Sequence, residues 1–280
     1  MHVLITILVD NNAIGPNLKS EHGLSMFIEV DGRAMLFDTG QSDLLIHNAS
    51  ALGIDLTRTE AIALSHGHYD HVGGLLPVLE IIPKPCPVYA HPDVFNGRYS
   101  YSTGKPRKAG CMFTVDDLER AGAILHLDRE SREIFPGVFT TGEIPRVTDF
   151  EDVGGKFYLD SEGTNPDLIR DDQSIVIDSA EGLILLCGCC HSGVVNTILH
   201  AKKLFPDSSV TEVIGGLHLK NASSDRMDKT IEKLGEFGVT MVKGLHCTGE
   251  RQSQLLSASF PSHTISDGNV LNPTQVNLEG

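Results

Sequence analysis

The sequence predicts an α/β fold in which two β-sheets pack face to face and helices cover their outer surfaces. Strand patterns joined by tight turns dominate the first third of the chain, and strand and helix patterns alternate in the last third. Two β-rich halves, each with its own helices, bury their apolar faces best in such layers. With 280 residues, of which 40% are hydrophobic, the chain is long enough for one large domain.

The first third of the chain contains the clearest turn signal. Asp31 and Gly32 separate two strand-like runs, and this pair is typical of a tight hairpin. The apolar run Ala61–Ser65 is expected to be a buried strand. In this third we expect strands at Val3–Val9, Leu24–Val30, Arg33–Phe37, Ala61–Ser65 and Val88–Ala90, and helices at Ser42–Leu52 and Gly74–Glu80.

The middle of the chain is less regular. From about residue 96 to residue 170 the composition predicts an irregular, loop-rich insertion within a single domain that spans residues 1–280. A helix at Phe113–Ala121 and a strand at Val138–Thr141 are expected there. In the last third we expect strands at Gln173–Ile177, Gly182–Cys187, Val210–Ile214 and Thr240–Val242, and helices at Val194–Phe205, Ser224–Phe237 and Glu250–Phe260.

Composition argues against several classes of partner. The formal net charge of −15, from 22 basic and 37 acidic residues, argues against general nucleic-acid binding, which needs clustered Lys and Arg. No stretch approaches the roughly 20 apolar residues of a membrane helix. Thiols beside a histidine at Cys187–His191 indicate a reducing compartment, and the first residues are typical of a strand and not of a signal peptide. We therefore expect a cytoplasmic protein with a small-molecule substrate.

The densest chemical signal is a loop with four metal-ligand side chains in six positions, His66, His68, Asp70 and His71. Imidazole and carboxylate groups hold zinc, iron or manganese. His66 and His68 are two residues apart, so an extended chain points both to the same side. Asp70 and His71 are adjacent and diverge, which lets them reach a second ion. The loop can therefore supply two ligands to each of two metals.

Three further strand ends carry possible ligands. Cys189 and His191 follow the predicted strand Gly182–Cys187 and can face the same side. His246 follows the predicted strand Thr240–Val242 and precedes a helix. His218 also lies at a strand end, where it is either structural or a substrate-binding or acid/base residue.

The His66–His71 loop, placed after a buried strand, resembles the metal-binding motif of the metallo-β-lactamase superfamily. Ser65 and Gly73-Gly74 resemble the flanks of that motif, and Asp38 resembles an earlier acidic motif. The resemblance implies a four-layer αβ/βα sandwich of two mixed sheets, with a two-metal site at one edge. It also implies that Asp38 orients the histidine loop, and that His246 completes the shell of the second ion.

The resemblance is incomplete at the downstream ligands. The superfamily usually has a bridging Asp where this chain has Cys189, and a His before that strand where this chain has Arg170–Ser174. The missing imidazole is expected to be replaced by His191, or by Asp171 or Asp172. The ions are expected to be zinc, with manganese, iron or magnesium as alternatives.

Segments around residues 141–146, 187–193, 215–219 and 244–249 resemble the subgroup that includes dihydropterin ribofuranosylaminobenzene phosphate synthase, which also has many members called metal-dependent hydrolases. The resemblance implies hydrolysis of a phosphate-containing or ester substrate by metal-activated water. A transferase that expels pyrophosphate is one alternative, and a non-hydrolytic redox or sensor protein is another.

Residue roles follow from this expectation. Asp70 and His218 are the expected catalytic residues, with His218 giving a proton to the leaving group. Glu143, Arg146 and Lys105 are the expected substrate contacts, the two cations as phosphate ligands. The remaining histidines are expected to be surface or locally hydrogen-bonded residues: His2, His22, His47, His91, His126, His200 and His263.

Overall fold

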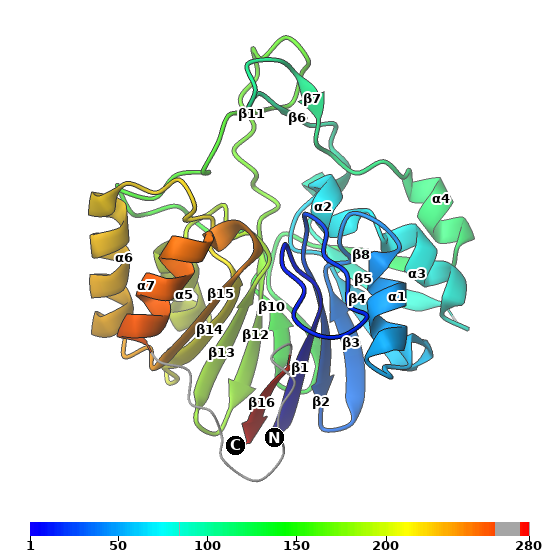
Figure 1. The fold of residues 1–280 in the computed structure, drawn as a ribbon, viewed down its shortest axis with the longest axis horizontal. Coiled ribbons are helices and arrows are strands. Elements are labelled where there is room, and N and C mark those ends of the chain that lie inside the picture. Colours follow the sequence, from blue (N-terminus) through cyan, green and yellow to red (C-terminus); the bar gives the residue numbers. More distant parts are fainter. Residues whose placement is uncertain (84, 261–274, 280) are drawn as a thin grey trace. The chain divides into compact units, whose positions relative to one another are not determined.

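The computed structural model describes residues 1–83, 85–260 and 275–279. As predicted, the fold is of the mixed α/β class (Figure 1), with mixed sheets and flanking helices. The described residues form two compact units, one of residues 1–83, 85–96, 110–128 and 275–279 and the other of residues 97–109 and 129–260. We call them unit 1 and unit 2. Whether they fold as the single predicted domain stays a prediction.

Unit 1 is built on a seven-stranded sheet with the order β16-β1-β2-β3-β4-β5-β8. Its strands are β1 (His2–Val9), β2 (Ser25–Val30), β3 (Arg33–Phe37), β4 (Thr59–Ala63), β5 (Cys86–Ala90), β8 (Ala123–Leu127) and β16 (Gln275–Glu279). Its helices are α1 (Leu44–Ala51), α2 (Tyr69–Val72), α3 (Leu75–Ile81) and α4 (Val115–Arg120), with 3-10 turns η1 (Leu56–Arg58) and η2 (Pro92–Phe95). β3, β4, β5 and β8 run parallel, so the chain returns through helices between them.

Helices α1, α3 and α4 cover one face of this sheet (Figure 1). The core between them is apolar and includes Leu45 of α1, Val78 of α3 and Leu118 of α4, all fully buried. The predicted hairpin joins β2 and β3, where Asp31 and Gly32 both have positive φ. Thr114 and Asp117 form a capping box that begins α4.

Unit 2 is built on a six-stranded sheet with the order β15-β14-β13-β12-β10-β9, and it also carries a small sheet β11-β6-β7. Its strands are β6 (Tyr99–Ser100), β7 (Arg107–Lys108), β9 (Arg132–Phe135), β10 (Val138–Thr140), β11 (Phe157–Tyr158), β12 (Ser174–Ser179), β13 (Gly182–Cys187), β14 (Val210–Gly216) and β15 (Met241–Leu245). Its helices are α5 (Val194–Leu204), α6 (Ser224–Glu236) and α7 (Glu250–Ser259), with the 3-10 turn η3 (His246–Thr248). These three α-helices cover one face of the larger sheet (Figure 1).

Three neighbouring strands of unit 2 run parallel, β13 beside β14 and β14 beside β15. Their carboxyl ends therefore meet at the same edge of the sheet. This arrangement positions a candidate site, because each of these three strands is followed by cysteine or histidine residues.

The irregular middle of the chain contains more regular structure than its composition suggests. β8 and β9 were not among the expected strands, yet each extends a sheet at its edge. Edge strands lack the strong apolar alternation of central strands, and Ile124 of β8 is half exposed. The strand β16 was also not expected, and the predicted role of His263 falls outside the described residues.

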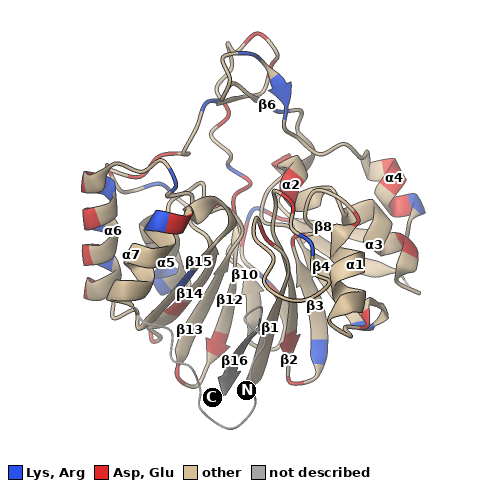
Figure 2. Cartoon of the chain, in the orientation of Figure 1, with Lys and Arg blue, Asp and Glu red and all other residues tan. Residues whose placement is uncertain are grey.

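Charged side chains lie mainly on helices and loops, and the strands of both large sheets carry few of them (Figure 2). No helix in the described ranges is both long and apolar enough to cross a lipid bilayer.

Glu212 of β14 is an exception, because it is a half-buried acid on a strand. Burial, reinforced by the charge of Glu181, raises its pKa from 4.5 to about 7. The unfolded chain ionises this group first, so stability falls as the pH rises from 4.5 to about 7 and stays lower above that. Partial exposure screens the effect, so Glu212→Gln is expected to add about 1 kcal/mol at pH 8, or about 2–4 °C in Tm. Thermal unfolding at pH 4, where the gain should vanish, provides the control, and an equal gain at both pH values would contradict the assignment.

Candidate metal centre

In unit 1 the histidine loop begins directly after β4. His66 and His68 are both buried, and Nε2 of His66 lies 2.9 Å from Nδ1 of His68. The two imidazoles therefore face the same side of the loop, as their spacing predicted. Gly67 between them is required by close packing, because a Cβ at this position would overlap the carbonyl oxygen of Val94.

Asp70 and His71 lie on the short helix α2. Oδ2 of Asp70 is 3.9 Å from Nε2 of His71, so the two side chains converge on one point and do not diverge. The chain is helical here, so these adjacent side chains are separated by about 100° around the axis, and not by the roughly 180° of an extended strand. The ring of His71 also lies 4.3 Å from that of His66, measured between centroids. His66 thus lies beside both His68 and His71, and Asp70 lies beside His71, although His68 belongs to no group of candidate ligand atoms among the described residues.

Asp38, directly after β3, fixes the histidine loop by hydrogen bonds. Its Oδ1 accepts a hydrogen bond from the Ser65 amide, and its Oδ2 accepts from Ser65 Oγ and from Nδ1 of His71 at 2.7 and 2.6 Å. Ser65 Oγ in turn lies 2.8 Å from Nδ1 of His66. These contacts engage Nδ1 of both histidines, so Nε2 is the nitrogen that each could offer to a metal, which is the arrangement an orienting residue must provide.

His22 is a contact that the sequence did not indicate. Its Nε2 lies 3.1 Å from Oδ2 of Asp70, and its side chain is largely exposed. The loop that carries it precedes β2 and has no ligand-like spacing. Only the fold brings it to Asp70.

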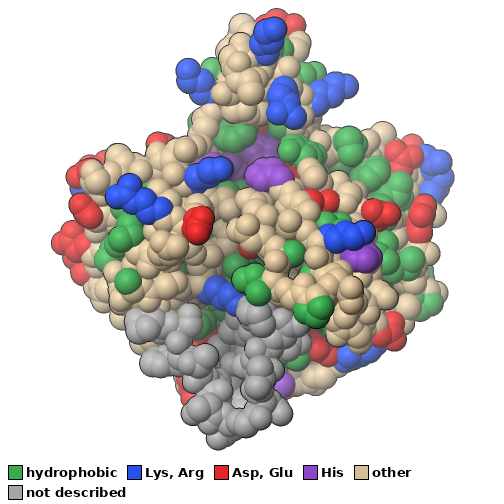
Figure 3. Space-filling view, in the orientation of Figure 1, with side chains coloured by type: hydrophobic (Ala, Val, Ile, Leu, Met, Phe, Trp, Pro, Cys, Tyr) green, Lys and Arg blue, Asp and Glu red, His purple; other side chains and the backbone are tan. Residues whose placement is uncertain are grey.

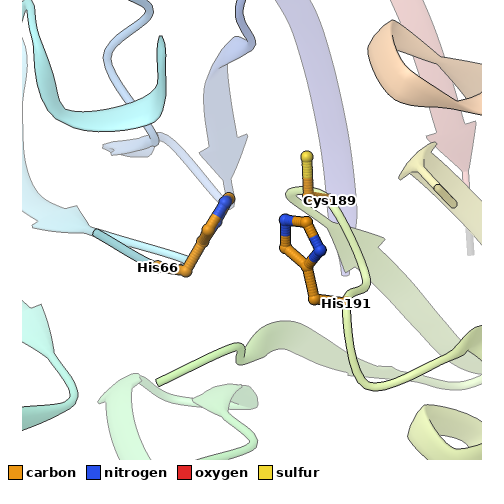
Figure 4. A group of neighbouring side chains, drawn as sticks. All are labelled: His66, Cys189 and His191. Carbon is orange, nitrogen blue, oxygen red and sulfur yellow. The ribbon is translucent and has the colours of Figure 1, made fainter. Parts of the chain in front are cut away.

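In unit 2 the cysteine-rich segment follows β13. Cys189 and His191 are buried and lie next to one another there (Figure 4). Nδ1 of His191 donates to the carbonyl oxygen of Val153 at 2.7 Å, so Nε2 is the nitrogen that His191 could offer to a metal.

Asp172 holds this segment in place. Its two carboxylate oxygens accept hydrogen bonds from the amides of His191 and Ser192, at 3.0 and 2.8 Å. Burial raises its pKa to about 6. Asp171, the other carboxylate considered as a replacement ligand, instead pairs with Arg98 at 2.6 Å. Among the described residues neither carboxylate belongs to a group of candidate ligands.

The other two strand ends bring their side chains to Cys189. Its sulfur lies within 4.8 Å of a ring nitrogen of His191, of His218 and of His246, and of the sulfur of Cys247. His218 and His246 both have left-handed backbones, with φ of 47° and 46°. Such conformations are uncommon outside glycine and cluster at functional sites.

Cys247 is the second residue that sequence reasoning missed. It is adjacent to the predicted ligand His246, which was the available signal. Burial opposes ionisation of its thiol, but contacts with Cys189 and His218 and the charge of His246 hold its pKa well below the usual range. The neighbouring thiol outweighs burial at His218 and raises the pKa of that imidazole. Cys247 and His218 therefore favour each other's charged forms.

The expected substrate contacts have local partners. Glu143 pairs with Arg129 at 3.0 Å, and Nη2 of Arg146 donates to the carbonyl oxygens of Leu168 and Ile169. Lys105 lies in the exposed lobe formed by β6, β7 and β11, on which basic side chains gather (Figure 3). A phosphate-binding role for these residues stays a prediction.

A family model described as the metallo-beta-lactamase superfamily matches residues 20–166. The chain is 33% identical over 254 residues to the 7,8-dihydropterin-6-methyl-4-(beta-D-ribofuranosyl)-aminobenzene-5'-phosphate synthase of Methanocaldococcus jannaschii, covering 86% of this chain and 85% of that protein.

Two solved structures show the likeness in three dimensions. Tm1679, described as a metal-dependent hydrolase of the beta-lactamase superfamily, matches with a TM-score of 0.78 and 32% identity, over 93% of this chain and 94% of that one. The metallo-beta-lactamase fold protein YhfI from Bacillus subtilis matches with a TM-score of 0.55 at 11% identity, over 93% and 94% of the two chains, a similarity of fold alone.

Proposed function

Because this chain belongs to the metallo-β-lactamase superfamily, we propose that it is a metal-dependent hydrolase of a phosphate-containing or ester small molecule. The observation that carries this proposal is the buried loop of His66, His68, Asp70 and His71, which Asp38 and Ser65 hold by hydrogen bonds. Side chains held in this way are preorganised for metal binding, because little conformational freedom remains to be lost.

The donor atoms fit divalent metals. Unit 1 offers three imidazoles and a carboxylate, and unit 2 offers two thiols and three imidazoles, all largely desolvated. Borderline-soft zinc prefers this mixture of nitrogen, sulfur and oxygen, and manganese or iron would accept part of it. We propose His66, His68, Asp70 and His71 from unit 1, and Cys189, His191 and His246 from unit 2, as the ligands of two ions.

When bound, divalent ions acidify water and neutralise phosphate charge. The residues of the chain then have separate tasks. Asp70 is the retained catalytic candidate, since its Oδ2 faces Nε2 of His71 and is also contacted by His22, so it can hold or pass a proton. Arg146 or Lys105 would bind the phosphate, and Asp38 keeps the imidazoles oriented.

A second candidate function is a transferase that expels pyrophosphate. The 33% identity to a protein named as a dihydropterin-type synthase, over most of both chains, favours it. Neutralisation of phosphate charge serves both reactions, so the ligand set supports either.

The thiols at the site must stay reduced to bind metal, which fits the predicted cytoplasmic setting.

The test is a substrate screen combined with a ligand variant. The purified chain, loaded with Zn²⁺ or Mn²⁺, would be assayed against phosphodiesters, lactones, thioesters and pterin pyrophosphates. We expect turnover that falls at least about 100-fold in His68→Ala, together with a lower content of bound metal, because a direct ligand should cost more than the 10- to 100-fold typical of its supporting residues.

His47→Ala is the matched control, since His47 is an exposed histidine of the same unit. Pyrophosphate release that requires an amine acceptor would favour the transferase over the hydrolase. Metal binding without turnover of any of these substrates would favour the redox or sensor alternative. Unchanged metal content in His68→Ala would overturn the site assignment.

A further inference from the structure

Three residues of unit 2 closely follow the ends of neighbouring strands. Cys189 lies two residues beyond the end of β13, His218 two beyond β14, and Cys247 two beyond β15. These three strands are parallel neighbours, and the register pairs Cys187 with Gly215 and Gly216 with Leu245, so the three strand ends meet at one edge of the sheet. The two sulfurs and one ring nitrogen of His218 all lie within 4.8 Å of one another.

The surroundings of His218 select the nitrogen that faces the thiols. Its Nε2 donates to the carbonyl oxygen of Gly154 at 3.1 Å, and its buried Nδ1 has no hydrogen-bond partner among the described residues. A backbone carbonyl at one imidazole nitrogen is the usual device that presents the other nitrogen to a metal. Gly154 makes room for this ring, because a Cβ there would overlap it.

The loop that carries Gly154 is itself tethered. Oδ1 of Asp152 accepts hydrogen bonds from Nη1 of Arg226, at 2.7 Å, and from the Gly154 amide, at 2.8 Å. The loop therefore holds a defined position against the imidazole of His218. At the other end of the cluster, the His218 amide donates to the sulfur of Cys247 at 3.3 Å. Amide donors of this kind stabilise metal-bound thiolates.

We propose that Cys189, His218 and Cys247 form a thiolate-rich metal site that is complete within unit 2 and suited to Zn²⁺. Two donors that share one ion at bond lengths of about 2.0–2.3 Å lie at most about 4.6 Å apart, so small side-chain rotations close the observed group. Two thiolates and one imidazole leave a fourth position open, which is the pattern of a catalytic zinc site. The inference rests on the proposed function only in assigning Cys189 to a metal, and it makes His218 a ligand and not an acid.

The test uses Co²⁺ as a spectroscopic substitute for zinc in the full chain, after removal of bound metal with a chelator. Thiolate-to-cobalt charge-transfer absorption is expected in the unaltered protein. Cys247→Ser should lower it to about half per bound ion, because one of two thiolates is lost. The double variant Cys189→Ser/Cys247→Ser should abolish it, and Cys111→Ser, which changes a thiol of unit 1, should leave it unchanged.

The double variant His66→Ala/His68→Ala should keep the absorption, since the proposed ligands all come from unit 2. Its loss there, or an unchanged absorption in Cys247→Ser, would overturn the inference, while His68-dependent turnover could still support the proposed function. Conversely, Cys247-dependent absorption without turnover would contradict the proposed function and leave the metal site of unit 2 supported. If the cysteine variants do not fold, alkylation of the unaltered chain gives a second measurement. Zn²⁺ should protect both Cys189 and Cys247 from iodoacetamide, and protection of Cys189 alone would refute the site.

Discussion

Replacing Asp38 by Asn is expected to weaken metal binding by about 10- to 100-fold, although Asp38 itself need not touch a metal. The carboxylate is fully buried and accepts three hydrogen bonds, two from Ser65 and one from Nδ1 of His71. An amide of the same shape has only one oxygen, so one donor is left facing an NH₂ group. The histidine loop then loses the contact that directs its imidazoles.

Metal affinity measured by competition with a chromophoric chelator tests this prediction. Asp55→Asn is the matched control, because Asp55 is an exposed carboxylate of the same unit that accepts from Thr57. The free energy of unfolding of the metal-free protein should be measured in parallel, since the buried donors also contribute to stability. Unaltered metal affinity in a folded Asp38→Asn protein would show that the loop does not depend on this carboxylate.

Replacing Arg98 by Ala is expected to destabilise the protein by about 3–5 kcal/mol, because it leaves two buried carboxylates without their counter-ion. Arg98 is 2% exposed, and its guanidinium pairs with Asp171 at 2.6 Å and with Asp167 at 3.2 Å. Arg98 directly precedes the exposed lobe formed by β6, β7 and β11. These ion pairs therefore connect the start of that lobe to the segment that leads into Asp172. We therefore also expect the cysteine-rich segment to lose order.

Chemical denaturation measures this loss. Arg58→Ala is the control, since its pair with Glu29 is partly exposed and should contribute only about 0–1 kcal/mol. Adding Asp167→Asn and Asp171→Asn to Arg98→Ala should recover part of the stability, because it removes the two buried negative charges that have lost their counter-ion. A loss below about 1 kcal/mol for Arg98→Ala would mean that water reaches these carboxylates in the folded protein.

Most of the regular elements were predictable because their signals are local. The hairpin at Asp31-Gly32 follows from two residues that tolerate positive φ, and α5 and α6 follow from long amphipathic periods. The edge strands β8 and β9 were missed because pairing with a neighbour, and not their own pattern, makes them strands.

The same distinction between local signals and long-range contacts applies to the residues of the candidate site. His66, His68, Asp70 and His71 were found because they lie within six positions, and spacing alone brings them together. His22 and Cys247 were missed, and Asp172 was considered as a ligand although its oxygens hold backbone amides. Each of these contacts joins segments that are far apart in the chain, about which local spacing says nothing.

By itself, then, the sequence determined the fold class, the loop proposed to bind metal and the carboxylate that supports that loop. Only the tertiary structure decided that Cys189, His218 and Cys247 form one group. Neighbouring members of this group lie 29 residues apart, which is too far for local spacing to bring them together. The parallel pairing of β13, β14 and β15 brings them together, because it places the three strand ends at the same edge of the sheet.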